Sequence, residues 1–261
     1  MTTGSLLWRG VIVGFIAALL SFGLLKTVGE PAVDRAIAFE TAMDEAKAKA
    51  KQDEAMAKGM SMPAEEDSQE LVGRPVQSGI GLFTGVTVYN LAFGGLFALA
   101  FAICCGRIGN WSPRVTAGVL AISGFLAVYA VPIIKYPANP PSIGNPDTIG
   151  LRSAIYFAMI LLSFASMIAA WNVRNRLVDQ FGAWNATLIG AAVYLVAAVL
   201  FALAMPPLNE VPEGFPAVVL WQFRMASLGA QAIMWTVIGL GFGTWVEHDL
   251  AQAKQGRLRT A

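Results

Sequence analysis

The sequence predicts an all-α, polytopic integral membrane protein, and two observations lead to this fold class. Of the 261 residues, 56% are hydrophobic and only 13% are charged, whereas a soluble globular protein averages about 25% charged residues. Apolar runs of roughly 20 residues recur along the chain, which is long enough to cross a hydrocarbon core of about 30 Å. Helices are expected rather than barrel strands, because each segment must satisfy its own backbone polar groups in lipid.

Six segments are candidate transmembrane helices, and five helices are the alternative count. Tryptophans lie at or near the ends of these runs, where their rings suit the membrane–water interface. A cleaved signal peptide is the less favoured interpretation of the first run, because no A-x-A site follows Leu25. In chain order, the candidate spans are Trp8–Val28, Gly79–Cys105, Val115–Ile134, Leu151–Trp171, Trp184–Met205 and Trp221–Val246.

The basic residues of the short loops predict that both termini lie in the cytoplasm of a bacterial cell, with the chain in its cytoplasmic (inner) membrane. Cytoplasmic loops carry an excess of Lys and Arg. A five-helix topology would place the basic C-terminal tail outside, which fits this rule less well. Lys26, Lys135, Arg152 and Arg224 lie at the outer edge of the six-helix topology and are exceptions to the rule. The residues assigned to the inner side are Arg9, Arg107, Arg114, Arg174, Arg176, Lys254, Arg257 and Arg259.

The connection between the first two spans, residues 30–78, is long, polar and acidic. It holds eleven Asp and Glu residues against six Lys and Arg. The run that follows Pro31 is rich in good helix formers, and Gly59 and Pro63 are expected to end that helix. The segment is interpreted either as a solvated helix or as a surface that concentrates cations near a pore. The chain is thus divided into a first transmembrane helix at 1–29, an acidic extracytoplasmic helical segment at 30–78, and the remaining helices at 79–261.

Two loops rich in Pro, Asn and Gly, at 135–150 and 206–220, are predicted on the same side of the membrane as the acidic segment. Their prolines and turn residues restrict the backbone, so they are expected to shape an outer vestibule. Asp147, Glu210 and Glu213 lie in these loops and are candidate metal ligands that face a hydrated divalent cation. The alternative is that these acids only pair with neighbouring arginines and stabilise the loops.

Arg152 and Arg224 each stand close to the start of the helix that returns from one of these loops. We expect both to form structural ion pairs, Arg152 with Asp147 and Arg224 with Glu213. Arg74 has the corresponding place after the acidic segment, so three two-helix units in the same orientation are a further hypothesis, with chance similarity of membrane loops as the alternative.

No Asp or Glu lies near the centre of a predicted span, although buried carboxylates are the usual mark of proton-coupled pumps. His248 is expected to be a solvated residue at a helix end, and the adjacent Cys104 and Cys105 are expected to be structural rather than disulfide-bonded. The sequence contains no nucleotide-binding motif. The polar residues singled out within the spans as candidates are Thr84, Thr87, Tyr89, Asn90, Ser123, Ser163, Ser166, Ser227 and Gln231.

Two long stretches, KYPANPPSIGNPDTIGLRSAIYF and PPLNEVPEGFPAVVLWQFRMASLGAQAIMW, resemble the CbtA family of probable cobalt transporter subunits. The doubled proline, the PEGFP run and the WQFRMASL string are the most specific features, and the resemblance extends over essentially the whole chain. Phe39–Glu40 is similar to an aromatic–acid pair of the family, which adds Glu40 to the candidate metal residues.

The resemblance implies a subunit of a cobalt uptake system that is not an enzyme and has no permanently bound cofactor, with the cobalt ion as its substrate. It also implies a small one-helix partner, CbtB, that carries a histidine cluster. A homo-oligomer is a further possible assembly in the lipid bilayer, and no nucleic-acid partner is expected. Two alternatives remain: a non-transporting scaffold that stabilises another membrane complex, and a lipid-modifying enzyme, for which no convincing catalytic pair is present.

Overall fold

The computed structural model of the chain describes residues 2–58, 72–141 and 143–260, and every regular element in these ranges is helical. Short π-helical turns join several helices without a break, at Leu25–Gly29, Gln77–Gly81, Phe125–Ala130 and Ile238–Phe242, and a 3₁₀ turn at Pro146–Thr148 precedes α7. The helices are α1 (Thr3–Leu24), α2 (Glu30–Ala57), α3 (Arg74–Val76), α4 (Leu82–Cys104), α5 (Pro113–Gly124), α6 (Val131–Lys135), α7 (Ile149–Ala204), α8 (Ala217–Val237) and α9 (Gly243–Thr260).

Five continuous helical segments of the described chain are long and apolar enough to cross a membrane. Large apolar side chains point outward from them, for example Leu203 and Ile134, which are 77% and 81% exposed. Such surfaces are unfavourable in water and suit lipid. The prediction of an all-helical membrane protein is therefore confirmed. The five segments are Thr3–Ala57, Arg74–Cys104, Pro113–Lys135, Pro146–Ala204 and Ala217–Gly256.

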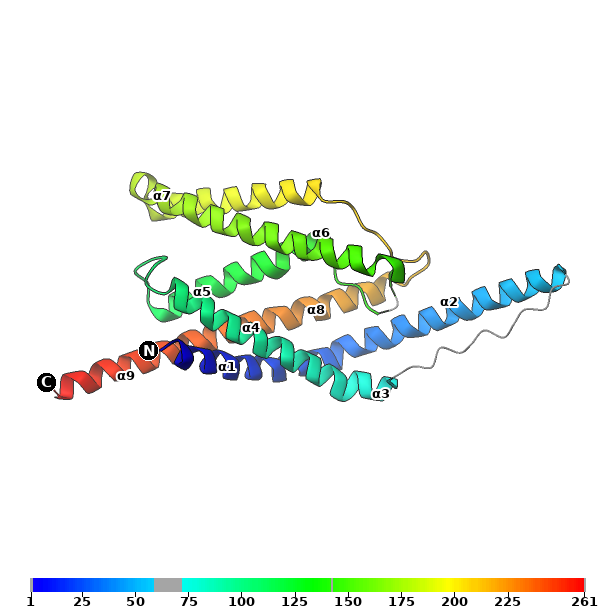
Figure 1. Cartoon of the computed structure of the whole chain (residues 1–261), viewed down its shortest axis with the longest axis horizontal. Helices are drawn as coiled ribbons and strands as arrows, with labels where there is room; N and C mark the ends of the chain where they lie inside the picture. The colour runs from blue at the N-terminus through cyan, green and yellow to red at the C-terminus, as the bar shows by residue number, and fades with distance from the viewer. Residues whose placement is uncertain (1, 59–71, 142, 261) are drawn as a thin grey trace.

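The longest single helix, α7, is a helical hairpin. Its 56 residues would extend about 84 Å if they were straight, far more than a bilayer. The backbone leaves the helical conformation at Gly182, where φ is 75° and ψ is 162°, a region that glycine adopts readily. The two arms lie side by side (Figure 1), and the hydroxyl groups of Ser163 and Tyr194 hydrogen-bond across them at 2.9 Å.

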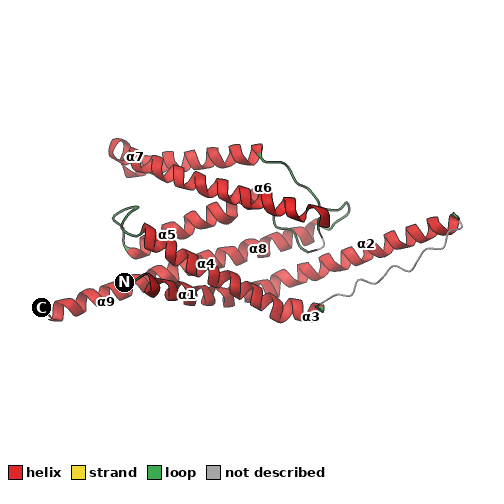
Figure 2. Ribbon diagram, viewed as in Figure 1, coloured by secondary structure: helices red, strands yellow, loops and turns green. Residues whose placement is uncertain are grey.

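Both ends of the chain lie at the same end of the bundle, which we call the termini end (Figures 1 and 2). The opposite end carries the connections from α6 to α7 and from α7 to α8, and we call it the loop end. These connections, residues 136–148 and 205–216, contain the two Pro-rich stretches.

The acidic segment begins as a direct extension of α1. The π-helical turn Leu25–Gly29 joins α1 to α2, and the Glu30 amide donates to the carbonyl of Leu25 across it. Pro31 lies in the first turn of α2, and because it has no N–H to donate, a widened turn accommodates it without ending the helix. The predicted stop at Gly59 lies outside the described residues.

The first turns of α2 pack against both Pro-rich loops. Ala32 and Ala36 are buried in a small cluster with Ile143 of the first loop and Phe215 of the second. The ring of Phe39 lies edge-on to that of Phe215, with 5.1 Å between centroids. The remainder of α2 extends beyond the bundle (Figure 1), so α2 contributes to the loop end only through its base.

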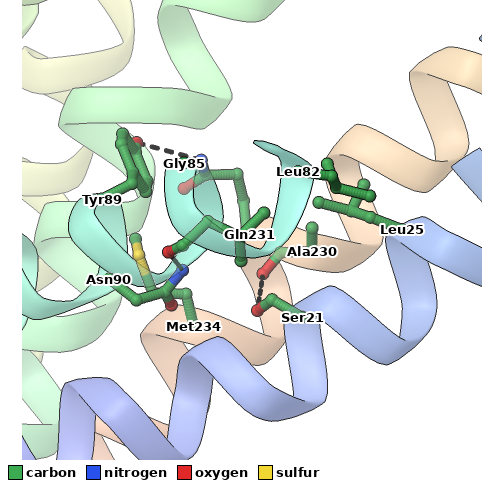
Figure 3. A pocket seen from close by; sticks show the side chains of 10 residues that line it. Ser21, Leu25, Leu82, Gly85, Tyr89, Asn90, Ala230, Gln231 and Met234 are labelled. Carbon is green, nitrogen blue, oxygen red and sulfur yellow. Dashed lines mark hydrogen bonds between the residues drawn. The ribbon is translucent and has the colours of Figure 1, made fainter. Parts of the chain in front are cut away.

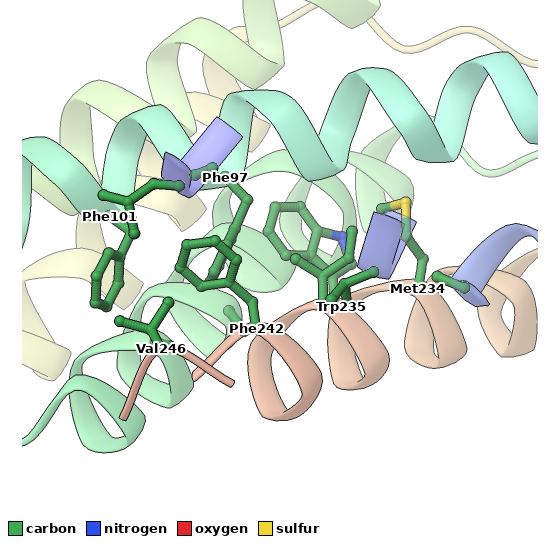
Figure 4. Packing of buried hydrophobic residues seen from close by; sticks show 13 residues of the cluster. Phe97, Phe101, Met234, Trp235, Phe242 and Val246 are labelled. Carbon is green, nitrogen blue, oxygen red and sulfur yellow. The ribbon is translucent and has the colours of Figure 1, made fainter. Parts of the chain in front are cut away.

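The main core lies where α1, α4, α5 and α8 meet toward the termini end. Phe97 and Phe101 of α4 pack edge-on against Phe242, and Trp235 and Val246 complete the row (Figure 4). These side chains are buried and in contact with one another. The core therefore holds α8 in place, and α8 carries several polar residues toward the loop end.

The helices α1 and α4 cross with their backbones in close approach. Gly10 and Gly14 form a G-x-x-x-G pair, a pattern that lets membrane helices pack tightly. A Cβ atom at Gly10 would overlap the carbonyl oxygen of Gly94, and one at Gly14 would lie 2.5 Å from the carbonyl oxygen of Asn90. This contact fixes the position of Asn90 within the bundle.

Candidate functional site

The structure does not bring the predicted metal residues together. Glu40, Asp147 and Glu213 are exposed, and only Glu210 is partly buried. In the ranges 2–58, 72–141 and 143–260, no group of three or more His, Cys, Asp or Glu side chains is placed to hold a metal ion. The described residues therefore form no group of three or more such ligands from the loop acids.

Glu210 joins the two Pro-rich loops. Its carboxylate accepts a hydrogen bond from the Thr148 hydroxyl at 2.6 Å and from the Asn145 amide at 3.0 Å. The Arg152 guanidinium lies 3.3 Å from the same carboxylate. The Thr148 hydroxyl, then the Asn145 amide and Arg152, lower the pKa of Glu210 below its ordinary value of 4.5, although partial desolvation opposes them. The group is thus held as a carboxylate.

The two arginines have partners other than those expected. Arg152 pairs with Glu210 of the other loop rather than with Asp147. Arg224 donates to the carbonyl oxygen of Ala138 at 3.2 Å and to Oδ1 of Asn139 at 3.0 Å, so neutral loop oxygens replace the expected Glu213. The sequence placed each arginine beside a loop acid, but in the fold both guanidinium groups contact oxygen atoms of the first loop, and Arg152 also lies against Glu210 of the second.

A cavity of about 560 Å³ lies between the two loops and the loop-end turns of α7 and α8. We call it the loop-end cavity. Its volume lies within the range of small-molecule binding sites, about 300–1,000 Å³. The lining combines arginine, tyrosine, serine, amide and apolar side chains. Its polar members are Tyr89, Tyr129, Tyr136, Asn139, Arg152, Ser153, Tyr156, Asn209, Glu210, Arg224, Ser227 and Gln231.

Two polar stripes, one on each of two helices, account for much of this lining. Arg152 and Tyr156 are four residues apart on α7, and Arg224, Ser227 and Gln231 are spaced by three and four on α8. Residues at these spacings share one face of a helix. Polar residues in a membrane helix are costly unless they face protein or a water-filled cavity. The cavity therefore accounts for the polar residues that these two helices carry near the loop end.

A second cavity, of about 360 Å³, lies between α1, α4 and α8, and we call it the inner cavity (Figure 3). Asn90 lines it and is only 3% exposed. The Asn90 amide nitrogen donates to the carbonyl of Val86, and its Oδ1 has no hydrogen-bond partner. Ser21 donates to the carbonyl of Ala230 on the opposite wall at 3.3 Å.

Tyr89 and Gln231 line both cavities. The Gln231 amide donates to the Tyr89 hydroxyl at 3.0 Å, as Figure 3 shows. This hydrogen bond therefore stands at the boundary between the loop-end cavity and the inner cavity. The sequence had indicated both residues as polar members of spans, but only the fold shows that they meet.

Ion pairs connect the helices at the termini end. Arg9 lies 2.6 Å from Asp249, with side chains 14% and 24% exposed, and Arg114 lies 3.6 Å from Glu247. His248 is exposed beside them. Cys104 and Cys105 are free thiols near the same end.

Sequence reasoning missed several residues of the loop-end cavity. Tyr129, Tyr136 and Tyr156 were not singled out, since aromatic residues near helix ends are usual in membrane proteins. The Tyr129 hydroxyl hydrogen-bonds Ser227 at 2.9 Å, and the Tyr136 hydroxyl donates to the carbonyl of Pro206 at 2.8 Å. The helical spacing of Arg152 with Tyr156 on α7, and of Arg224 with Gln231 on α8, is the sequence signal that could have placed these four residues on one cavity wall.

The fold and the cavities define an α-helical integral membrane protein with cavities between its helices. A family model described as "Probable cobalt transporter subunit (CbtA)" matches residues 3–247. The chain therefore belongs to the CbtA family, and the resemblance seen in its Pro-rich stretches is confirmed. Neither the curated proteins nor the solved structures contain a match.

Proposed function

We propose that this chain is a membrane subunit of an uptake system for cobalt or a related divalent transition metal in the bacterial cytoplasmic membrane. The observation that carries the proposal is the family match, which extends over residues 3–247. The polar lining of the loop-end cavity, which shares Tyr89 and Gln231 with the inner cavity, supports it, because a transport route needs polar groups within the apolar core. Cobalt is the substrate in this proposal, and no resident cofactor is required.

In the proposed topology, the chain crosses the membrane six times, with each arm of α7 counted separately. Both ends of the chain are then cytoplasmic, and α2 and the two Pro-rich loops are extracytoplasmic. Support comes from the basic residues near the termini end. Arg107 follows α4 and Arg114 begins α5, and Arg174 lies against the rings of Trp111 and Trp171.

The proposed route starts at the loop end. The exposed acids Glu40, Asp147 and Glu213 would raise the local concentration of cations there without coordinating them tightly. The hydrogen bond between Tyr89 and Gln231 separates the loop-end cavity from the inner cavity. Since both residues line both cavities, we propose that this bond is the internal boundary of the route.

A partner subunit with histidines fits this proposal. Cobalt favours imidazole and carboxylate ligands, and this chain contains one histidine in all, His248. The family description names a subunit rather than a complete transporter. We therefore propose that a small one-helix CbtB-type protein supplies the imidazole groups. The family assignment also favours a protein that is not an enzyme.

A non-transporting scaffold is the second candidate function. It is favoured by the finding that the described ranges hold no group of three or more His, Cys, Asp or Glu side chains placed for a metal ion. A scaffold would stabilise another membrane complex without changing metal levels in the cell.

The content of Co, Ni, Zn and Cu in cells with and without the chain distinguishes these functions. Transport predicts that loss of the chain lowers cobalt, or one chemically related metal, in cells grown with limiting metal. A scaffold predicts an unchanged metal content together with loss of another membrane complex, which quantitative analysis of membrane proteins would reveal.

A further inference from the structure

The loop-end cavity is lined by more positive than negative charge. Two arginines, Arg152 and Arg224, contribute to its wall, and Glu210 is the one carboxylate among its lining residues. The formal charge of the lining is therefore +1. The cavity also adjoins the start of α7, where Ile149 is a lining residue, and the N-terminus of a helix carries a partial positive charge. Such a wall attracts an anion, and a divalent metal that entered the cavity would be favoured there in an anionic complex rather than as the bare ion.

Of the two arginines that line the cavity, Arg224 has no ion pair with an acid of the described residues. Arg152 is balanced by Glu210 at 3.3 Å, whereas Arg224 donates only to the neutral oxygens of Ala138 and Asn139. The Arg224 side chain is half-buried in a wall that also contains apolar residues. A positive group in such surroundings gains strongly from an anion, because water screens the attraction less there than at an open surface.

The neighbouring side chains can donate hydrogen bonds to such an anion. Ser153 and Tyr156 of α7 and Ser227 of α8 line the same cavity as the arginines. A guanidinium group presents its N–H donors in a planar fork that matches carboxylate and phosphate oxygens. A site rich in donors, with an excess positive charge, is suited to oxyanions rather than to neutral sugars or to cations.

We propose that the loop-end cavity binds a small oxyanion, through a carboxylate or phosphate group that contacts Arg224. The cavity of about 560 Å³ accommodates a molecule of the size of a tricarboxylate. The inference concerns the metal-free anion and is independent of the proposed cobalt transport. If the chain does carry a divalent metal, an anionic carboxylate chelate of that metal satisfies the cavity better than the hydrated ion.

The anion has two possible sources, a soluble molecule or the headgroup of a lipid, and the experiment separates them. The full-length chain is purified in a neutral detergent, and its thermal unfolding is followed with citrate, inorganic phosphate or chloride at equal ionic strength. In a parallel arm, the chain is placed in nanodiscs of phosphatidylcholine with or without phosphatidylglycerol. Isothermal titration with citrate then gives the dissociation constant.

Arg224→Gln is the test variant, and Arg107→Gln is its matched control. Arg107 is an exposed arginine at the termini end, bonded to the carbonyl oxygens of Ala102 and Ile103, and it does not line the loop-end cavity. Loss of a charge-assisted hydrogen bond predicts that Arg224→Gln weakens oxyanion binding about tenfold or more, with Arg107→Gln unchanged. Tyr156→Phe, which removes one hydroxyl group and keeps the ring, is a milder variant expected to weaken binding by a smaller factor.

The two arms of the experiment test oxyanion binding for either source of the anion. Stabilisation by citrate or phosphate that depends on Arg224 supports a soluble oxyanion, and stabilisation only by phosphatidylglycerol with the same dependence supports a lipid headgroup. If the wild-type chain shows no preference for either over chloride or phosphatidylcholine, the proposal is overturned. It is equally overturned if both arginine variants bind the anion as the wild type does. Cobalt is absent from every arm, so a negative result here does not bear on the transport proposal. A failed test of cobalt transport likewise does not bear on oxyanion binding.

Discussion

At the scale of single residues, Glu210 is the charged contact between the two Pro-rich loops. It accepts hydrogen bonds from Thr148 and Asn145 and lies beside Arg152, and all three belong to the first loop or to the start of α7. A residue of one loop thus holds the other in place. Together with the hydrogen bond from the Tyr136 hydroxyl to the carbonyl of Pro206 and the packing of Ile143 with Phe215, this carboxylate joins the two loops that border the loop-end cavity.

The first prediction concerns the pH dependence of this contact. Because the folded state lowers the pKa of Glu210 below 4.5, the carboxylate stabilises the fold fully above that value, and the stabilisation is lost as the pH falls through the lowered pKa. Glu210→Gln should therefore lower the unfolding temperature at neutral pH, and the difference from the wild type should disappear in acid. Asp147→Asn, a change at an exposed acid, is the control and should match the wild type throughout. A constant difference at all pH values would contradict this account.

The second prediction concerns the exposed loop acids. Neutralising Asp147 and Glu213 together, as Asp147→Asn with Glu213→Gln, should slow metal uptake without changing the unfolding temperature. The deficit should be largest at low ionic strength and should shrink as the Debye length falls to about 8 Å at physiological salt. Uptake assays over a range of inert salt concentrations measure this. Wild-type rates at every salt concentration would remove these acids from the route.

The arginines show where prediction from the sequence reaches its limit. Their position after each loop indicated that the two arginines have a structural role. It did not indicate which residues they contact. Arg152 pairs with Glu210 rather than with the nearby Asp147, and Glu210 lies 58 residues further along the chain. Such a contact depends on how two loops pack, and periodicity within one helix carries no information about that. The same limit explains why the loop-end cavity was not foreseen, although most of its arginine and amide residues had been noted individually.

At the scale of helices, the crossing of α1 and α4 is the contact that tolerates the least change. A Cβ atom at Gly94 would overlap the carbonyl oxygen of Gly10, whereas one at the adjacent Gly95 would meet only Val11, at 3.9 Å. The third prediction follows: Gly94→Ala should destabilise the fold by about 1–3 kcal/mol because the helices must move apart. Gly95→Ala is the matched control and should be close to neutral. Thermal unfolding in detergent compares the two, and equal stability of both variants would show that the helices do not cross as described.

The hairpin of α7 was predictable in outline from the sequence. The two apolar runs Leu151–Trp171 and Trp184–Met205 were recognised as separate spans, and the described chain has its bend at Gly182 between them. The turn is so short that the helical hydrogen bonding is almost uninterrupted, so composition alone did not locate it. The uninterrupted passage from α1 into α2 was not foreseen, because a proline near a charged boundary usually marks a new helix.

At the scale of the whole molecule, the arrangement predicts which parts of the chain reach each side of the membrane. The fourth prediction is that a reporter joined at the C-terminus is active only in the cytoplasm, and one inserted after Ala64 only outside. The basic residues at the termini end are the physical reason. A C-terminal reporter that works only outside would rule out six crossings and favour five.

The central claim is that the chain moves a divalent transition metal, most directly cobalt, across the cytoplasmic membrane. The most direct measurement is the initial rate of radioactive cobalt uptake in cells that lack the chain, compared with cells in which it is restored together with a one-helix CbtB-type partner. The account predicts a faster rate in the restored cells that saturates with cobalt concentration. Equal rates, in cells where the restored chain is folded and present in the membrane, would contradict the claim and leave the chain as a scaffold.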